Sequence, residues 1–307
     1  MIELPRIPLG DVVEDAVDAL VDGAAPFFDA VATVIGTLFE GIAWLLHAPE
    51  PVVMILILAV LGLVARGWVF GVGSLVGFSV IAMLNQWTNA MDTLALILVA
   101  AVIAILISVP LGILAARNRT ASNIMRPVLD FLQTMPPFVY LIPALLLFGI
   151  GDVPGIVATV LFAVAPGVRL TELGIRGVDA EVVEAAYAFG ASPRRILRQV
   201  QLPLAMPSIL AGVNQVIMLS LSMVVIASMV GAGGLGNPVL TAINRIDVGL
   251  GFEGGISVVI LAIFLDRITA SFGGKRSAFL SLFVRPKSTA APAPAPQDAV
   301  EAEPARA

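Results

Sequence analysis

The chain has 307 residues, of which 59% are hydrophobic and 13% charged, and its mean hydropathy is +1.00. A soluble domain usually carries about twice that share of charged residues, so the composition excludes an ordinary soluble protein. The chain has no cysteine, which excludes disulfides and thiolate metal sites, and its single histidine, His47, excludes a histidine-based metal cluster. We therefore expect an all-α polytopic membrane protein with no metal site.

Residues 1–50 are rich in acidic side chains and precede the strongly apolar part of the chain. Apolar residues recur at helical spacing in Asp11–Val21, and in Pro26–Leu46 the polar residues fall along one helical stripe. This pattern favours an amphipathic helix lying in the membrane interface. A span over residues 26–46 stays open as the alternative, because most interfacial helices have basic polar faces and this one is acidic.

The remaining apolar runs predict about seven spans within a membrane domain covering residues 51–275, because roughly 20 apolar residues cross a ~30 Å hydrocarbon core. Prolines in the fourth and fifth spans are expected to kink or start those helices. The predicted spans are Pro51–Ala65, Trp68–Asn85, Leu94–Ala116, Met135–Ile150, Val153–Val168, Ser208–Val230 and Ile256–Phe272.

The distribution of basic residues sets the predicted orientation. Arginine and lysine gather after the first, third, fifth and seventh spans, whereas most acids fall on the other side. By the positive-inside bias, we expect the N-terminus of this multi-pass membrane protein outside and its C-terminus in the cytoplasm. Residues 276–307 would form a cytoplasmic tail, disordered from about residue 288, where the sequence becomes rich in alanine and proline.

One predicted cytoplasmic loop, residues 177–203, carries the signals of two short helices. Asp179 is a plausible N-cap, Gly190 can end the first helix in the left-handed conformation, and Ser192–Pro193 can start a second helix. That second helix is expected to stop near Pro203. An ordinary loop would need neither set of caps, and a DNA-binding helix–turn–helix is too tightly tethered to the membrane to reach a groove. We expect a docking surface for a protein partner and no nucleic-acid binding.

This loop resembles the EAA loop of ABC-importer permeases, whose pattern is EAA, three residues, G, nine residues, I, one residue, LP. Val200 replaces the isoleucine. In that family the loop is the coupling helix that inserts into a cleft of the ATP-binding subunit. The residues that the resemblance assigns to coupling are Glu184, Ala185, Ala186, Phe189, Gly190, Ala191, Ser192, Pro193, Leu202 and Pro203.

The resemblance also implies a fold and a set of partners. It implies the transmembrane fold of a type I ABC importer, with a five-helix core after two preceding spans. The expected partners are two ATP-binding cassette subunits, an extracytoplasmic substrate-binding protein, a second permease copy and membrane lipid. ATP and Mg would be bound by the ATP-binding subunits, so this chain would bind no cofactor and would not itself be an enzyme. A homodimer and a pair with a similar permease both remain open.

Residues 190–236 closely resemble glycine betaine/proline betaine permeases, which implies an osmoprotectant as substrate. A permease for choline, methionine or a sulfonate is the alternative, and an ATP-independent transporter or channel is a further one. Within the sixth span, Asn214, Gln215, Met218 and Ser222 are either hydrogen-bonding contacts between helices or a weakly polar translocation path.

The segment GAGGLG, residues 231–236, matches the GxGxxG pattern, but it follows a span and no βαβ unit surrounds it, so we exclude a dinucleotide site. We expect Gly231, Gly233, Gly234 and Gly236 to form a flexible turn at the outer mouth of the sixth span. Such a turn could serve gating or contact with a substrate-binding protein. Residues 272–277, FGGKRS, lack the spacing of a Walker A loop, so no nucleotide site is expected in this chain.

Overall fold

The computed structural model describes residues 9–272, and every regular element in that range is helical, which confirms the predicted all-α class. The predicted tail 276–307, its low-complexity end and residues 1–8 lie outside the described residues. In chain order the elements are α1 (Leu9–His47), α2 (Pro51–Arg66), α3 (Trp68–Met83), α4 (Trp87–Arg117), α5 (Arg119–Thr134), α6 (Pro137–Phe148), α7 (Asp152–Arg176), α8 (Ala180–Ala188), α9 (Pro193–Ile196), a π-helical turn (Leu197–Gln201), α10 (Leu202–Ser222), α11 (Val224–Ser228), α12 (Gly236–Arg245) and α13 (Val248–Phe272).

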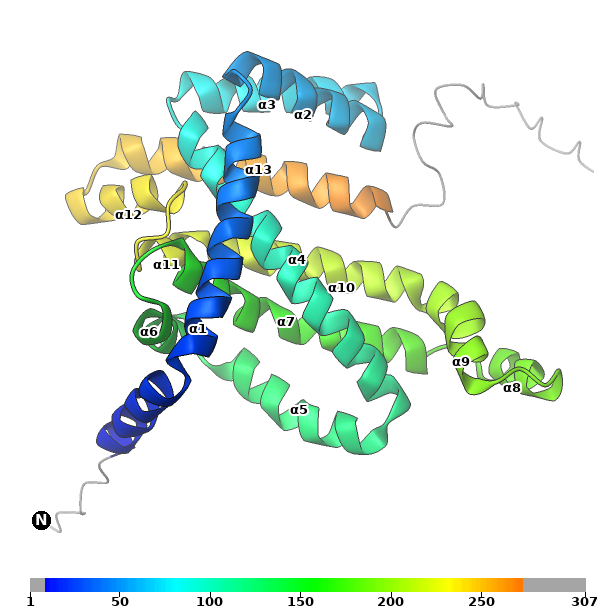
Figure 1. Cartoon of the computed structure of the whole chain (residues 1–307). Helices are drawn as coiled ribbons and strands as arrows, with labels where there is room; N and C mark the ends of the chain where they lie inside the picture. Colours follow the sequence, from blue (N-terminus) through cyan, green and yellow to red (C-terminus); the bar gives the residue numbers. More distant parts are fainter. Residues whose placement is uncertain (1–8, 273–307) are drawn as a thin grey trace, which may run out of the picture.

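The centre of the molecule is built from α4, α7 and α10, which pack closely because small residues lie where they meet (Figure 1). A Cβ added to Gly112 of α4 would come within 2.5 Å of the Cβ of Thr171 on α7. A Cβ on Gly174 of α7 would come within 2.7 Å of the Cβ of Ser208 on α10. Small residues of this kind let two membrane helices approach closely and gain van der Waals contact.

The described helices do not divide into seven equivalent spans. Five are long and apolar enough to cross a membrane: Gly23–His47, Trp87–Arg117, Asp152–Arg176, Pro193–Ser228 and Val248–Ser271. The first two expected spans correspond to α2 and α3, which have 16 residues each and are shorter than these five helices. They form a hairpin about Gly67, which has a φ of +91°.

The expected span Met135–Ile150 does not form one long apolar helix. Its helix, α6, has only 12 residues, and α5 and α6 count as one span only as a pair bent by 100°. Pro136 and Pro137 explain the bend, because a residue before proline is held in extended backbone. Met135 has φ −71° and ψ 135°, and Pro136 has φ −56° and ψ 138°. The preceding helix, α5, is capped by the Asn118 side chain, which accepts hydrogen bonds from the N–H groups of Thr120 and Ala121.

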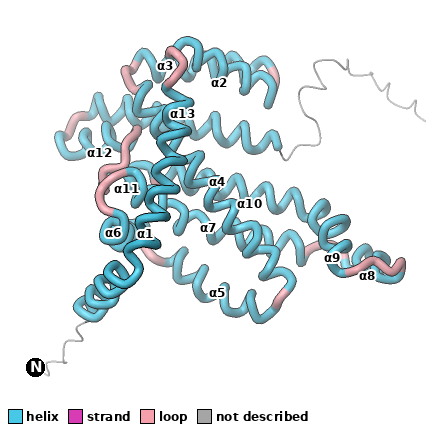
Figure 2. Tube along the Cα trace, in the orientation of Figure 1, coloured by secondary structure: helices cyan, strands magenta, loops and turns pink. Residues whose placement is uncertain are grey.

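The ends of the helices lie on two opposite sides of the molecule. The C-terminal ends of α2, α4, α7 and α13 lie on the same side as α8, which we call the α8 side, whereas α6, α11 and α12 lie on the opposite side (Figure 1). The connections between helices are short and gather at these two ends (Figure 2). Arg66, Arg117 and Arg176, in the last turns of α2, α4 and α7, therefore lie on the α8 side.

Helix α1 runs across the direction of α2, α3 and α13 in Figure 1, and it has a break at Ala24, two residues before Pro26. Its contacts lie at the ends of other helices that face away from α8. The Phe28 ring meets Phe148 at the end of α6, with centroids 5.7 Å apart. The His47 Nε2 atom lies 2.7 Å from Asp92 Oδ1 in the second turn of α4. The segment Gly23–His47 is long enough to span, so length alone does not decide between the two predicted placements.

Candidate coupling site

Three residues separate the end of α7 from the start of α8, and α8 projects from the helical bundle (Figure 1). Asp179 is its N-cap, as predicted, because its Oδ1 atom accepts a hydrogen bond of 2.9 Å from the N–H of Glu181. None of the nine residues of α8 is buried by the described part of the chain. Glu184 and Ala185 are exposed, and Ala186 is half-buried. A two-turn helix this poorly buried gains little stability within the chain, which leaves its surface available for another protein.

The turn after α8 has the geometry that the sequence predicts at Gly190. This glycine has a φ of +77°, in the left-handed region. Its N–H donates to the Tyr187 carbonyl over 2.9 Å, and the Ala191 N–H donates to the Ala186 carbonyl over 3.1 Å. These bonds satisfy carbonyls at the end of α8 and fix the turn. They also leave the Phe189 side chain 92% exposed at the tip.

The second helix starts as predicted but does not stop near Pro203. Ser192 occupies the N-cap position with extended backbone and without a side-chain cap bond, and Pro193 follows as the first helical residue. The π-helical turn Leu197–Gln201 then joins α9 to α10, and the segment Pro193–Ser228 is long and apolar enough to cross a membrane as one span. Pro203 is tolerated because it lies in the first turn of α10, where the wider turn already departs from regular α-helical hydrogen bonding. The loop therefore continues directly into a central membrane helix.

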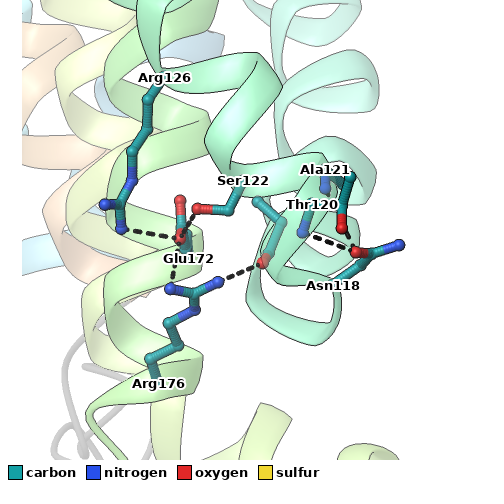
Figure 3. Close-up of polar contacts among 8 residues, drawn as sticks. Asn118, Thr120, Ala121, Ser122, Arg126, Glu172 and Arg176 are labelled. Carbon is teal, nitrogen blue, oxygen red and sulfur yellow. Dashed lines mark hydrogen bonds and ion pairs between the residues drawn. The ribbon is translucent and has the colours of Figure 1, made fainter.

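A buried carboxylate lies at the base of this loop, where α4, α5 and α7 meet (Figure 3). Glu172 of α7 is 7% exposed, and its Oε1 atom accepts a 2.7 Å hydrogen bond from the Ser122 hydroxyl of α5. The Arg176 Nη1 atom lies 3.1 Å from the same oxygen, and the Arg126 Nη2 atom lies 3.4 Å from it. Arg176 also donates to the Ala115 carbonyl at the end of α4 over 2.7 Å.

Sequence reasoning missed this cluster because it treated the arginines only as markers of orientation. The one local signal was the spacing of Glu172 and Arg176, four residues apart on a helix. The partners from α4 and α5 are 46 to 61 residues away in the chain, so only the folded structure brings them together. A second ion pair, between Arg169 and Asp130, also joins α7 to α5. The last turns of α7, from which α8 follows, are thus held by charge as well as by packing.

The glycine-rich turn lies on the side away from α8, between α11 and α12. Gly231 and Gly234 have φ values of +88° and +89°. The Gly233 N–H donates to Asp152 Oδ1 of α7 over 2.9 Å, and the Leu235 N–H donates to the Thr93 hydroxyl of α4 over 2.7 Å. A Cβ on Gly236 would come within 2.5 Å of the Val224 carbonyl oxygen. The turn exists as predicted, but the flexible character expected for it does not fit these bonds, which tie it to two central helices.

The polar residues of the sixth predicted span lie on different faces of α10. The Asn214 side chain contacts α13, because its amide donates to Asp266 over 3.2 Å and its oxygen accepts from the Thr269 hydroxyl over 2.6 Å. Gln215 and Ser222 are exposed, and Met218 is half-buried. The structure thus gives Asn214 a helix–helix contact and leaves Gln215 and Ser222 on a face that the rest of the described chain does not cover.

Comparison with known proteins identifies the family. Residues 108–276 match the family model described as binding-protein-dependent transport system inner membrane component. The chain is 49% identical to the glycine betaine/proline betaine transport system permease protein ProW of Escherichia coli over 87% of this chain and 75% of that protein. It is 45% identical to the glycine betaine transport system permease protein OpuAB of Bacillus subtilis over 91% of this chain and 99% of that protein.

A solved structure of the MetNI methionine ABC transporter, in an inward-facing conformation, contains a chain with a related fold. The TM-score is 0.55 at 23% sequence identity, covering 62% of this chain and 96% of that chain. The predicted type I importer fold agrees with this likeness and with the helical architecture described above. The chain therefore belongs to the binding-protein-dependent transport system inner membrane component family, the multi-pass permease subunits of ABC importers.

Proposed function

We propose that this permease imports glycine betaine or proline betaine, and that α8, the Gly190 turn and α9 couple its movement to ATP-binding subunits. The observation that carries the coupling role is the continuity of the structure. The exposed α8 and Phe189 are joined by the Gly190 turn to α9, which continues through the π-helical turn into α10 without an intervening loop. A push on α8 would therefore reach a central membrane helix directly.

The substrate proposal rests on the relatives and on the chemistry of α10. Two relatives that align along most of this chain carry glycine betaine in their names. Glycine betaine is a small zwitterion with a quaternary ammonium group, and a neutral, weakly polar path suits a solute that must bind weakly and leave. The exposed face of α10 offers the amide of Gln215 and the hydroxyl of Ser222 without a formal charge.

That exposed face also supports a second permease copy. An amide in the middle of a span is unfavourable against lipid, because nothing in the hydrocarbon satisfies its hydrogen bonds. We expect the face with Gln215, Met218 and Ser222 to meet its equivalent in a homodimer, with the translocation path between the two copies. Two ATP-binding subunits would then dock on the two α8 helices, one on each copy.

The proposed placement of the chain in the membrane is supported by charge and contacts. The α8 side would be cytoplasmic, because the predicted basic residues share it. The glycine-rich turn and α12 would then be extracytoplasmic and available to a substrate-binding protein. Helix α1 would lie along that outer surface, because its contacts with α4 and α6 lie at their outer ends instead of along their length. Crossing contacts of this kind favour the interfacial placement of residues 26–46.

The decisive test is transport by the purified chain in proteoliposomes. With its ATP-binding subunit and substrate-binding protein, the chain should take up radiolabelled glycine betaine when ATP is present, and excess unlabelled proline betaine should compete. Methionine and choline serve as control competitors. Uptake by this chain alone, without ATP, would refute the ABC mechanism. ATP-dependent uptake of methionine or choline with none of betaine would refute the substrate only.

A further inference from the structure

An apolar groove of about 440 Å³ lies between the α2–α3 hairpin and α13, outside the central helices. The Phe264 ring forms part of it, stacked against Phe70 with centroids 6.0 Å apart and set edge-on to Phe78 with centroids 4.9 Å apart. Gly73 leaves one wall open, since a Cβ there would meet no atom within 4 Å. Apart from Ser74, the polar residues of the lining are Arg66 and Arg267.

The length of the groove matches one leaflet of a bilayer. Its lining runs along α3 from Val69 to Phe78, which corresponds to about 13 Å at the ~1.5 Å rise of an α-helix. Half of a ~30 Å hydrocarbon core is about 15 Å. The groove thus has the reach of an acyl chain that enters from the membrane surface at one end and stops near the middle of the bilayer.

The two arginines stand at one end of this groove, on the α8 side, where α2 ends and α13 approaches its last turn. Their contacts within the chain are weak. The Arg66 Nε atom is 3.4 Å from the Arg267 carbonyl oxygen, and among the side chains that the structure describes no carboxylate lies within 4.0 Å of Arg66. The Arg267 Nε atom lies 3.9 Å from Asp266 Oδ2, while the other oxygen of that carboxylate accepts from Asn214. Among the described side chains, Asp266 is the only carboxylate paired with either guanidinium group, which leaves a net positive charge at this end of the groove.

We propose that this groove binds an anionic glycerophospholipid, with one acyl chain against Phe70, Gly73 and Phe264 and its phosphate against Arg66 and Arg267. A basic site between membrane helices, beside an apolar slot, is the combination that recognises an anionic headgroup and its chain together. The lipid fills space between the hairpin and α13, and thereby joins the α2–α3 pair to the rest of the permease. This site is independent of the transported solute and of the proposed substrate.

The test uses the full-length chain in nanodiscs that contain equal amounts of phosphatidylglycerol and phosphatidylcholine, followed by mild extraction and native mass spectrometry. The wild type should retain phosphatidylglycerol over phosphatidylcholine by about tenfold or more, since each basic residue near a membrane surface contributes to anionic lipid binding. R66Q/R267Q should reduce that preference to near one. G73L should reduce retention of both lipids by filling the groove, and R119Q, an exposed arginine on the same side, should behave as wild type.

Several results would overturn the proposal. These are equal retention of the two lipids by the wild type, an unchanged preference in R66Q/R267Q, or an equal loss in R119Q. Circular dichroism and size-exclusion chromatography establish whether each variant folds. If G73L does not fold, the lipid preference of R66Q/R267Q decides whether the groove binds an anionic lipid. Because the chain has no native cysteine, a cysteine introduced by G73C can form a disulfide only with another introduced cysteine. G73C therefore tests whether a second copy of the chain occupies the groove. Disulfide-linked dimers of G73C would show that a second copy fills the groove and would refute the lipid site.

Discussion

Replacing Gly190 tests the coupling turn through its backbone alone. The φ of +77° places this residue in the left-handed region, and a Cβ there would meet no atom within 4 Å. A substitution therefore adds conformational strain without a steric clash. Left-handed backbone costs a residue with a Cβ roughly 1–2 kcal/mol, with alanine near the lower figure and β-branched valine near the upper one. We expect Gly190→Ala and Gly190→Val to disfavour the turn by about 1 and about 2 kcal/mol, respectively.

These energies convert into a measurable loss of docking. If the ATP-binding subunit recognises α8 only when the turn is formed, its apparent Kd rises as the competent fraction falls, by at most about fivefold for alanine and about thirtyfold for valine. Overall thermal stability should change little, because α8 has no buried residue in the described chain. The measurement is titration of the ATP-binding subunit onto the permease in nanodiscs, together with ATP-dependent uptake.

The matched control is Gly255→Ala in α13. A Cβ there also meets no atom within 4 Å, but Gly255 has ordinary helical backbone, so docking and uptake should stay at the wild-type level. Wild-type docking by Gly190→Val would refute the role of the turn. Equal losses in Gly190→Val and Gly255→Ala would show that the effect does not come from the left-handed backbone.

Three further substitutions test the packing around the site. Glu172→Gln should lower stability by about 2 kcal/mol, because a neutral amide can still accept from Ser122 but no longer pairs with the charges of Arg176 and Arg126. Exposed Glu184→Gln should leave the melting temperature of the detergent-solubilised protein unchanged. Gly112→Val should destabilise the protein by about 1–3 kcal/mol, because the valine side chain would overlap α7. Size-exclusion chromatography should then show less monodisperse protein, whereas normal yield and stability would contradict the close approach of α4 to α7. Asp152→Ala removes the hydrogen bond from the Gly233 N–H, which contributes about 1 kcal/mol. Amide exchange in the glycine-rich turn should therefore accelerate while exchange in α8 stays the same. Unchanged protection of the turn would show that this bond does not hold it.

The amino-acid sequence by itself determined the features that depend on local chemistry. Asp179 caps α8 because its carboxylate reaches the next turn, and Gly190 takes a positive φ because it lacks a Cβ. The long apolar run of α4 predicts a membrane helix from composition alone, and the EAA spacing identifies the permease family. Each of these signals lies within a few turns of chain, where propensity and spacing suffice.

The tertiary structure alone decided the features that depend on distant partners. Glu172 is buried by residues of α4 and α5, and no pattern near it in the sequence shows that Ser122 and Arg126 will meet it. The path of α10 depends on a π-helical turn that absorbs Pro203, which local rules treat as a stop. The contacts of α1 with Phe148 and Asp92 likewise join residues far apart in the chain, whereas its length and hydropathy suit both a span and an interfacial helix. Packing between distant helices chooses among conformations that local chemistry leaves equally acceptable.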